Sequence, residues 1–396
     1  MNLNSNNSNK KSKDLTNFLK SKDDGVFYTG HASILVRLNN KKYLFDYINN
    51  INFYRNSWIF FPNQIIDDRL FNVDGVFVSH IHQDHYDPSL LRKFQKKKIP
   101  IYVLDERPGF KLSLKKEKIR AKFIPVRKKT YIDTNTWVYG CLHEYNDIDS
   151  SMLISNNNLS VYHGNDNFIT EKSLAPFKKK VGHVDVACVP FAYINYYPYL
   201  LNGISKKINK AEAIRLESLF MDYGIMQSKI LKPEIVIPFG SNLFHLDDPK
   251  CDMNKGVATP VDFVNYAKIK HKQQSDKYKT MLSGSFCLKK NDKISLYYEK
   301  ISQKRFDKEL VKFTNKKKQL SKKVKTIKKV PITKNKLEFI RNKIKLNSNK
   351  IDHNIVISKK SNSKEKIIIN LKTNNVICRY QTTIPENCPY FIVQDN

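Results

Sequence analysis

Short runs of β-branched and aromatic residues, separated by polar turns, recur along the first 240 residues of the chain. Between residues 25 and 48, the runs SILVRL and KYLFDY are split by NNKK, a pattern typical of a β-hairpin. Most later runs are short and apolar, as expected of strands buried inside a fold. They lie at 73–80, 99–105, 122–126, 136–142, 151–156, 159–166, 183–192 and 233–240.

Two longer stretches have helical spacing instead. Apolar residues recur every three to four positions in 88–98 and in 209–231, and the second stretch stops before Pro233. Strands with hairpins therefore come first, and strands alternating with helices follow. We predict the α/β (α+β) class, with two sheets packed together and helices outside, as a four-layer αββα sandwich.

Changes in composition divide the chain into four segments. A polar tail over 1–24 is expected to be disordered, and a catalytic domain is expected over 25–300. Residues 301–350 contain 18 Lys and Arg against 3 Asp and Glu. This predicts a basic linker or helix over 301–330, followed by a small C-terminal α+β module over 331–396.

The chain carries no pattern typical of secretion or of membrane insertion. Its first residues, MNLNSNNSNKKSKD, include no apolar segment of a secretory signal. No run reaches the roughly 18 apolar residues of a membrane span. The six cysteines are widely spaced without a CxxC pair, which favours reduced thiols over a disulfide framework. We therefore predict a cytoplasmic protein without a transmembrane segment.

The net charge of +33 is extreme, and only 11 of the 70 basic residues are Arg. Phosphate recognition often favours Arg, because its planar side chain makes bidentate contacts. A lysine-rich chain is therefore consistent with a coding bias. The alternative is an anionic partner: an anionic small-molecule substrate, or a nucleic acid or anionic membrane surface bound through the basic C-terminal segment.

The segment SHIHQDHYDPSLL at 79–91 concentrates metal-ligating side chains at the end of an apolar strand. His80 and His82 alternate, so they point the same way if the strand continues. Asp84 and His85 are adjacent and diverge, which suits a turn that serves two ions. Imidazole together with carboxylate favours zinc, iron or manganese.

Three later residues at or just past strand ends complete a candidate two-metal site. A carboxylate between two ions is a natural bridge, and such ions lie about 3.5–4 Å apart. We predict two divalent ions, zinc first, with iron or manganese as alternatives. The predicted ligands are His80, His82 and His143 for one ion, Asp84, His85 and His245 for the other, and Asp166 as the bridge, with Asp84 and Asp166 as the catalytic carboxylates.

These motifs resemble the metallo-β-lactamase superfamily. TGHASILV, LFDY, SHIHQDH and the later Asp and His follow the order of that family over roughly 25–290. GHAS, and the absence of a glycine after HxHxDH, are similar to the branch that includes ascorbate-phosphate lactonase and the phospholipase D acting on N-acyl-phosphatidylethanolamine. The tRNA-processing nucleases usually carry that glycine, so the resemblance disfavours a nuclease.

Downstream segments are most similar to the metallo-β-lactamase half of CMP-N-acetylneuraminate hydroxylase. They are IPIYVLDERPGF, DIDSSMLI, NDN and IVIPFGSNLFHLDDPKCDMN. That enzyme takes electrons from a Rieske domain, which needs two Cys and two His in paired short motifs. Here Cys141 and His143 have no such counterpart, so we interpret Cys141 as a core residue.

Several further residues are candidates for supporting a ligand or facing the substrate. In the resembling fold the position of Asp46 usually orients a metal ligand, although a turn role at the strand end is the alternative. His31 either supports the site, faces the substrate or packs structurally, and His163 is assigned a structural role. Tyr193, in an aromatic loop, and Asn242 and Asn254, near His245, are candidate substrate contacts.

Three functions follow from these residues. The first is a dinuclear metal-dependent hydrolase, in which a metal-bound hydroxide attacks a phosphoester, lactone or acyl-type bond of an anionic substrate. The second is a diiron oxygenase of a nucleotide sugar, which would need a separate redox partner. The third is a nucleic-acid-binding protein whose affinity depends steeply on salt. The ligand set favours the hydrolase.

Overall fold

The structure is a computed structural model of the chain. Contacts divide it into two compact units, the first comprising 1–194, 217–246 and 257–317 and the second the remainder. Each unit is described separately. The structure describes residues 7–49, 58–104, 108–144, 148–192, 194, 198, 201–202, 205–240, 242–245, 254, 257–321, 354–359, 366–370, 378–381 and 390–393.

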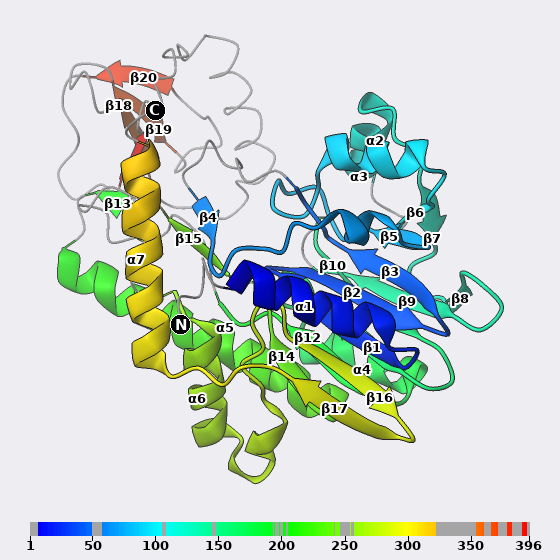
Figure 1. The fold of residues 1–396 in the computed structure, drawn as a ribbon. Helices are drawn as coiled ribbons and strands as arrows, with labels where there is room; N and C mark the ends of the chain where they lie inside the picture. The colour runs from blue at the N-terminus through cyan, green and yellow to red at the C-terminus, as the bar shows by residue number, and fades with distance from the viewer. Residues whose placement is uncertain are drawn as a thin grey trace. The chain divides into compact units, whose positions relative to one another are not determined.

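The first unit contains an eight-stranded mixed sheet in the order β17-β16-β1-β2-β3-β5-β6-β7 (Figure 1). The predicted hairpin forms β2 and β3, and its turn residues Asn39 and Asn40 have φ of 51° and 65°. Two successive positive φ angles match the twist of a tight hairpin. The strands are β1 (Asp24–Gly30), β2 (Ser33–Leu38), β3 (Lys41–Phe45), β5 (Gly75–Phe77), β6 (Ile101–Leu104), β7 (Lys122–Ile124), β16 (Phe286–Lys290) and β17 (Lys293–Tyr297).

A second sheet of six strands has the order β14-β12-β11-β10-β9-β8. The strands from β8 to β11 pair antiparallel, whereas β11, β12 and β14 run parallel. Parallel pairing requires a crossover, and helices supply it. The strands are β8 (Thr130–Tyr131), β9 (Trp137–Leu142), β10 (Ser150–Ser155), β11 (Ser160–His163), β12 (Val186–Val189) and β14 (Ile235–Pro238).

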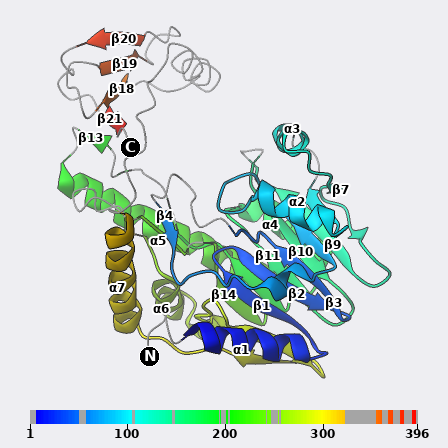
Figure 2. The ribbon, with the colours of Figure 1, turned by 45° about the horizontal axis from the view of Figure 1, so that its top comes forward.

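The two sheets face each other across an apolar core, and helices cover their outer faces (Figures 1 and 2). The central core joins Val36 and Phe45 of the first sheet to Met152 and Val161 of the second. The predicted αββα sandwich is therefore confirmed. The outer helices are α1 (Asn7–Lys20), α2 (Pro88–Lys96) and α3 (Pro108–Lys116) on the first sheet, and α4 (Glu171–Val181), the later part of α5 (Lys206–Leu231) and α6 (Pro260–Lys270) on the second.

Smaller elements complete the first unit. The short strands β4 (Trp58–Phe60) and β15 (Leu243–His245) pair with each other. Phe61 and Phe244 of this region share an apolar cluster with Phe306 of α7 (Gln303–Ser321). The expected basic linker or helix is thus helical over the range of α7. The described residues also form the 3₁₀ helices η2 (Asp68–Phe71) and η3 (Lys272–Lys277).

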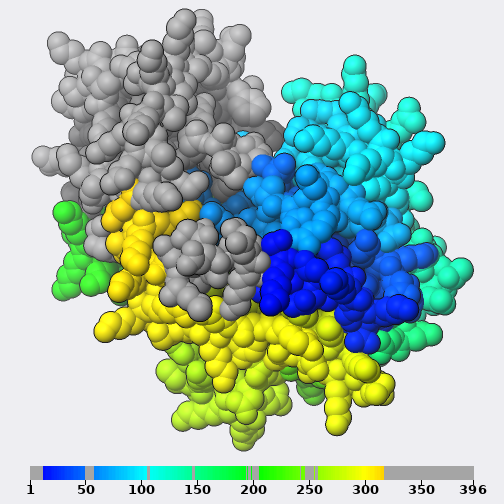
Figure 3. Space-filling view, viewed as in Figure 1, coloured from blue at the N-terminus to red at the C-terminus, as the bar shows by residue number. Residues whose placement is uncertain are grey.

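The N-terminal segment differs from its prediction as a disordered tail. Residues 7–20 form α1, and Leu15 and Phe18 are fully buried in the outer core of the first sheet. The prediction is wrong over this helix, because a few apolar residues on one face are enough to dock it. Figure 3 shows α1, in blue, beside the yellow segment that contains β16 and β17.

Removing the Phe18 ring should destabilise the protein. The ring lies 5.5 Å from Phe27 and 5.8 Å from Phe286, with Arg37 above its face. We expect Phe18→Ala to lower the free energy of unfolding by about 3 kcal/mol in chemical denaturation. Phe123→Ala is the control, because that ring is 42% exposed. Equal effects of the two variants would contradict the docking of α1.

The second unit contains a five-stranded sheet in the order β13-β21-β18-β19-β20. Strands were predicted for this C-terminal region, whereas the predicted helix near residue 340 lies outside the described residues. No described helix has both the length and the apolar character needed to cross a membrane. The strands are β13 (Leu201–Asn202), β18 (Asn354–Lys359), β19 (Lys366–Asn370), β20 (Cys378–Gln381) and β21 (Tyr390–Val393).

Candidate metal centre

The HxHxDH motif forms a tight loop between β5 and α2. The backbone N–H groups of His85 and Tyr86 both donate to the carbonyl of His82, at 3.0 and 2.9 Å. Asp87 then caps α2 by accepting from the Leu90 N–H, with Pro88 at the first turn. This early helix start confines the motif to a loop, and the four candidate ligands of the loop divide into two groups.

His80 and His82 form a first group with Asp166, which follows β11. Nε2 of His80 lies 2.8 Å from Nδ1 of His82 and 3.9 Å from Oδ2 of Asp166. His80 is completely buried, whereas His82 is exposed and Asp166 is partly exposed. The strand does not continue to these residues, because β5 ends at Phe77, and the loop brings the two rings to 4.4 Å between centroids.

Asp84 and His85 form a second group with His31. Oδ2 of Asp84 lies 3.1 Å from Nε2 of His31 and 3.4 Å from Nε2 of His85. All three residues are buried. Burial raises the pKa of Asp84, but His85 and His31 outweigh it and hold that pKa well below its ordinary value.

Asp166 lies between the two groups. The same oxygen that faces His80 lies 3.2 Å from Nε2 of His85. This is the position expected of a bridging carboxylate. Gly240 permits it: its φ is +77°, and a Cβ there would lie 3.3 Å from Oδ1 of Asp166.

Asp46 contacts His85 of the second group on the side of the ring that faces away from Asp84 and Asp166. Its Oδ2 lies 3.0 Å from Nδ1 of His85, and its Oδ1 accepts the Ser79 N–H at 2.8 Å. Burial raises the pKa of Asp46, but the hydrogen bond and the charge of His85 lower it. The lowering outweighs the effect of burial, so the pKa lies below its ordinary value. A carboxylate behind a histidine fixes the ring and turns Nε2 toward the site.

The charge balance of the site fits divalent cations. Among the described residues, Nε2 of His85 is buried without a hydrogen-bond partner, although carboxylate oxygens of Asp84 and Asp166 face it. Burial lowers the pKa of His85, but Asp166 and Asp84 outweigh burial and hold it well above its ordinary value. Carboxylates that attract a proton this strongly also attract a metal ion, and the imidazole and carboxylate set suits zinc, iron or manganese.

Replacing Asp46 should weaken metal binding without removing a ligand. We expect Asp46→Asn to lower the affinity for Zn²⁺ or Mn²⁺ by about 10- to 100-fold, because His85 loses its charged support. Calorimetric titration of the metal-stripped chain measures this. The control is Asp276→Asn in the exposed part of η3. Equal affinities in the two variants would contradict the role of Asp46.

The remaining predicted ligands, His143 and His245, belong to neither group of the described residues. His143 follows β9, and its N–H donates to the Asp149 carbonyl at 2.9 Å. His245 ends β15, with its ring edge-on to Trp58 at 4.9 Å. Their roles as ligands stay predictions.

The predicted substrate contacts have different outcomes. Asn242 is fully buried and donates to the Tyr28 hydroxyl, which in turn donates to the His31 carbonyl. It therefore supports the backbone of His31 and does not face a substrate. Asn254 is exposed in a turn, and Tyr193 lies outside the described residues.

Two predicted core residues are confirmed, and two supporting residues were missed. His163 is buried with Nε2 2.9 Å from the Ala32 carbonyl, and Cys141 packs in the core. Ser79 and Asn165 lie 3.1 Å from Nδ1 of His80 through Oγ and Nδ2. Their only signal in the sequence is that each directly precedes a predicted ligand.

A third cluster of the described residues has side chains spaced closely enough to ligate a metal ion, but it already contains a lysine. His183, Asp185 and Glu234 approach one another at the start of β12 and β14. Nζ of Lys289 lies 2.6 Å from Oδ1 of Asp185, so a cation already neutralises the buried carboxylate. We therefore interpret the cluster as an ion pair with a histidine at its rim.

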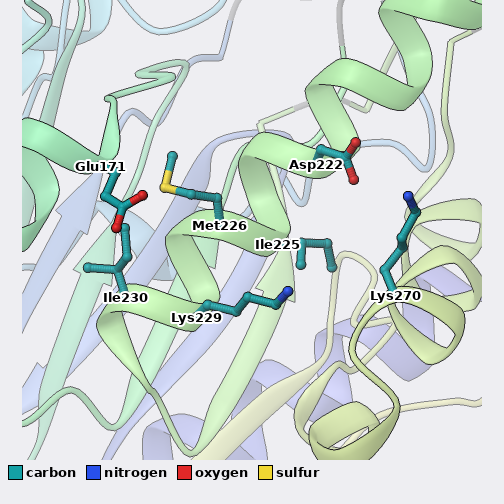
Figure 4. Close-up of a pocket in the computed structure, with 7 residues that line it drawn as sticks. All are labelled: Glu171, Asp222, Ile225, Met226, Lys229, Ile230 and Lys270. Carbon is teal, nitrogen blue, oxygen red and sulfur yellow. The ribbon is translucent and has the colours of Figure 1, made fainter.

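A surface pocket lies over the helices of the second sheet (Figure 4). Ile225, Met226 and Ile230 of α5 line it together with charged side chains of α4, α5 and α6. Its lining residues differ from those of the two metal groups.

A curated relative from Mycolicibacterium smegmatis, named as a Rieske 2Fe-2S iron–sulfur protein, is 36% identical over 83 residues. That match covers 20% of this chain and only 16% of the relative. The likeness to CMP-N-acetylneuraminate hydroxylase stays a prediction.

Two solved structures are similar to the chain at low identity. A metallo hydrolase from Ignicoccus hospitalis is 16% identical, with 70% of this chain and 99% of that chain covered and a TM-score of 0.43. A diiron β-hydroxylase from Streptomyces venezuelae is 15% identical, with 66% and 52% covered and a TM-score of 0.41. Because both scores are low, the family assignment does not rest on these structures.

The family assignment rests on the domain and on its fold. Residues 25–218 match the family model of the beta-lactamase superfamily domain. This range holds β1 to β3, the motif loop and Asp166, and it therefore contains both metal groups. Residues 25–218 therefore form a beta-lactamase superfamily domain, and the described residues around them have the metallo-β-lactamase fold.

Proposed function

We propose that this chain is a dinuclear metal-dependent hydrolase. The observation that carries the proposal is the position of Asp166, whose Oδ2 lies within 3.2 Å of His85 and 3.9 Å of His80. One carboxylate oxygen thus faces a nitrogen of each group. A pair of ions bound there would lower the pKa of a shared water and polarise a substrate oxygen.

The side chains of this chain hold and orient that centre. Asp46 fixes the His85 ring through Nδ1, while Ser79 and Asn165 contact Nδ1 of His80. Both rings therefore present Nε2 to the site. The buried inner residues and the exposed His82 leave the centre open on one side, where a substrate would enter.

The proposed substrate is an anionic phosphoester, lactone or acyl-type compound. The net charge of +33 supports an anionic substrate, since positive potential raises its local concentration. A cytoplasmic location and the binding of nucleic acid or a membrane surface through the basic segment after residue 300 stay predictions.

A second candidate is a diiron oxygenase served by a separate electron donor. The likeness to a protein named for a Rieske cluster favours it, although only 16% of that relative is matched. Histidine and carboxylate ligands also hold iron. The two candidates share the metal centre and differ in whether turnover needs a reductant and oxygen.

Metal analysis of the full chain, purified without added metal, tests the proposal together with its absorption spectrum. For the hydrolase we expect about two ions per chain and turnover of a phosphoester or lactone without a reductant. Chelation should abolish that turnover. Two irons with visible absorption that bleaches on reduction, together with oxygen consumption and no hydrolysis, would overturn the hydrolase in favour of the oxygenase.

A further inference from the structure

We propose that Asp149 is a ligand of the ion held by His80, His82 and Asp166. The inference rests on the dinuclear centre proposed above and identifies a carboxylate outside the predicted ligand set. Oδ1 of Asp149 is a buried atom 3.7 Å from Nε2 of His80. The side chain as a whole is 17% exposed, so its carboxylate is directed inward.

The surroundings of His80 show why this distance matters. Ser79 and Asn165 contact Nδ1 of the ring, so Nε2 points into the site. Among the described residues, three candidate ligand atoms lie near Nε2: Nδ1 of His82 at 2.8 Å, Oδ1 of Asp149 at 3.7 Å and Oδ2 of Asp166 at 3.9 Å. Ligand atoms about 2.1 Å from one shared ion lie roughly 3 to 4 Å apart. The distances of Oδ1 of Asp149 and of Oδ2 of Asp166 from Nε2 of His80 both fall within this range.

The backbone holds Asp149 in register with the other ligands. Its carbonyl accepts the His143 N–H, and the next residue, Ser150, begins β10 opposite Leu142. The Ser150 hydroxyl donates to the Ser79 carbonyl at 2.8 Å, and its own carbonyl accepts from Asn165 at 3.1 Å. Ser150 therefore connects Asp149 to the residues that directly precede His80 and Asp166.

When an ion occupies the site, the lone pair of His80 Nε2 is directed to the metal. That nitrogen then carries no proton and cannot donate to Asp149, whereas the ion would attract the negatively charged Oδ1 that lies 3.7 Å from Nε2. With Asp149 the first group becomes two imidazoles and two carboxylates. Carboxylate-rich sets suit manganese, and two histidines with a carboxylate are typical of non-haem iron, whereas imidazole suits zinc. Asp149 would therefore favour manganese or iron.

Metal titration of the full chain tests this assignment. Wild type, Asp149→Asn and Asp149→His are stripped with a chelator and titrated with Mn²⁺ and, separately, Zn²⁺. Free Mn²⁺ is followed by electron paramagnetic resonance and heat by calorimetry. We expect Asp149→Asn to lower the Mn²⁺ affinity of one of two sites by at least ~10-fold. Asp149→His should restore two-ion binding for Zn²⁺ with a smaller recovery for Mn²⁺.

Controls separate the alternative outcomes. His143→Gln tests the other candidate at the base of the same loop, and Asp276→Asn tests a remote loss of charge. Thermal unfolding of the metal-free variants checks that each one folds. Wild-type Mn²⁺ affinity at both sites of Asp149→Asn would overturn the assignment, especially if His143→Gln loses one ion. A wild-type chain that binds fewer than two ions would instead overturn the dinuclear centre itself, and the assignment with it.

Discussion

Replacing Asp166 with asparagine is expected to lower kcat/KM by about 10³-fold and to reduce the metal content from about two ions toward one. Asp166 is the residue whose single oxygen faces both His80 and His85. Metal-assisted polarisation stabilises a transition state by several kcal/mol, and each ~1.4 kcal/mol corresponds to tenfold in rate. An amide oxygen lacks the charge needed to bridge two cations.

The measurement pairs elemental analysis with turnover of the phosphoester or lactone found in the substrate screen. Asp276→Asn is the matched control, since it makes the same chemical change on an exposed part of η3. We expect that control to retain wild-type activity and metal content. Full activity in Asp166→Asn would show that the bridge is not part of the reaction and would remove the main support for the hydrolase.

The sequence predicted the layers and most of the two metal groups because these follow from local patterns. Apolar runs of strand length predicted the two sheets. The motif from His80 to His85 was recognisable because it follows such a run. The position of Asp166 after β11 followed in the same way. Such features depend on periodicity and on where strands stop, which a sequence shows directly.

The contacts around the centre were less predictable, because they depend on backbone conformations that the sequence does not show. His31, Asp46 and Asn165 have φ of 49°, 44° and 55°, in the left-handed region that few residues other than glycine adopt. These angles direct His31 at Asp84 and Asn165 at His80. Asp149 was missed because its approach to His80 depends on how two loops meet.

The prediction of a disordered N-terminal segment was wrong for a different reason. Residues 1–24 are mostly polar, and a segment of that composition has little apolar surface to bury on folding. Burial depends on position as well as on composition, and Leu15 and Phe18 both face the sheet. Packing of α1 against the first sheet stabilises a helix that its average composition did not predict.

Removing the buried carboxylate of Asp185 should destabilise the protein by about 3 kcal/mol at pH 7. Lys289 is 8% exposed and pairs with Asp185 at 2.6 Å, and Asp185→Asn leaves that ammonium buried without its counter-charge. Urea denaturation of both proteins measures the difference. Glu299→Gln is the control, because it removes an ion pair with Arg305 that is about one-third exposed; such surface pairs contribute below about 1 kcal/mol.

The pKa of Asp185 determines how this difference in the free energy of unfolding changes with pH. Burial raises the pKa of Asp185, but hydrogen bonds from Lys289 and Ser160 outweigh it and hold the pKa below its ordinary value. A carboxyl group with a lowered folded pKa stabilises the protein fully above its unfolded pKa of about 3.9. The difference between wild type and Asp185→Asn should therefore be constant near neutrality and shrink as the pH falls below about 4. A chelator should leave it unchanged if Lys289, and not a metal ion, neutralises Asp185; loss of the difference on chelation would instead identify a third metal site.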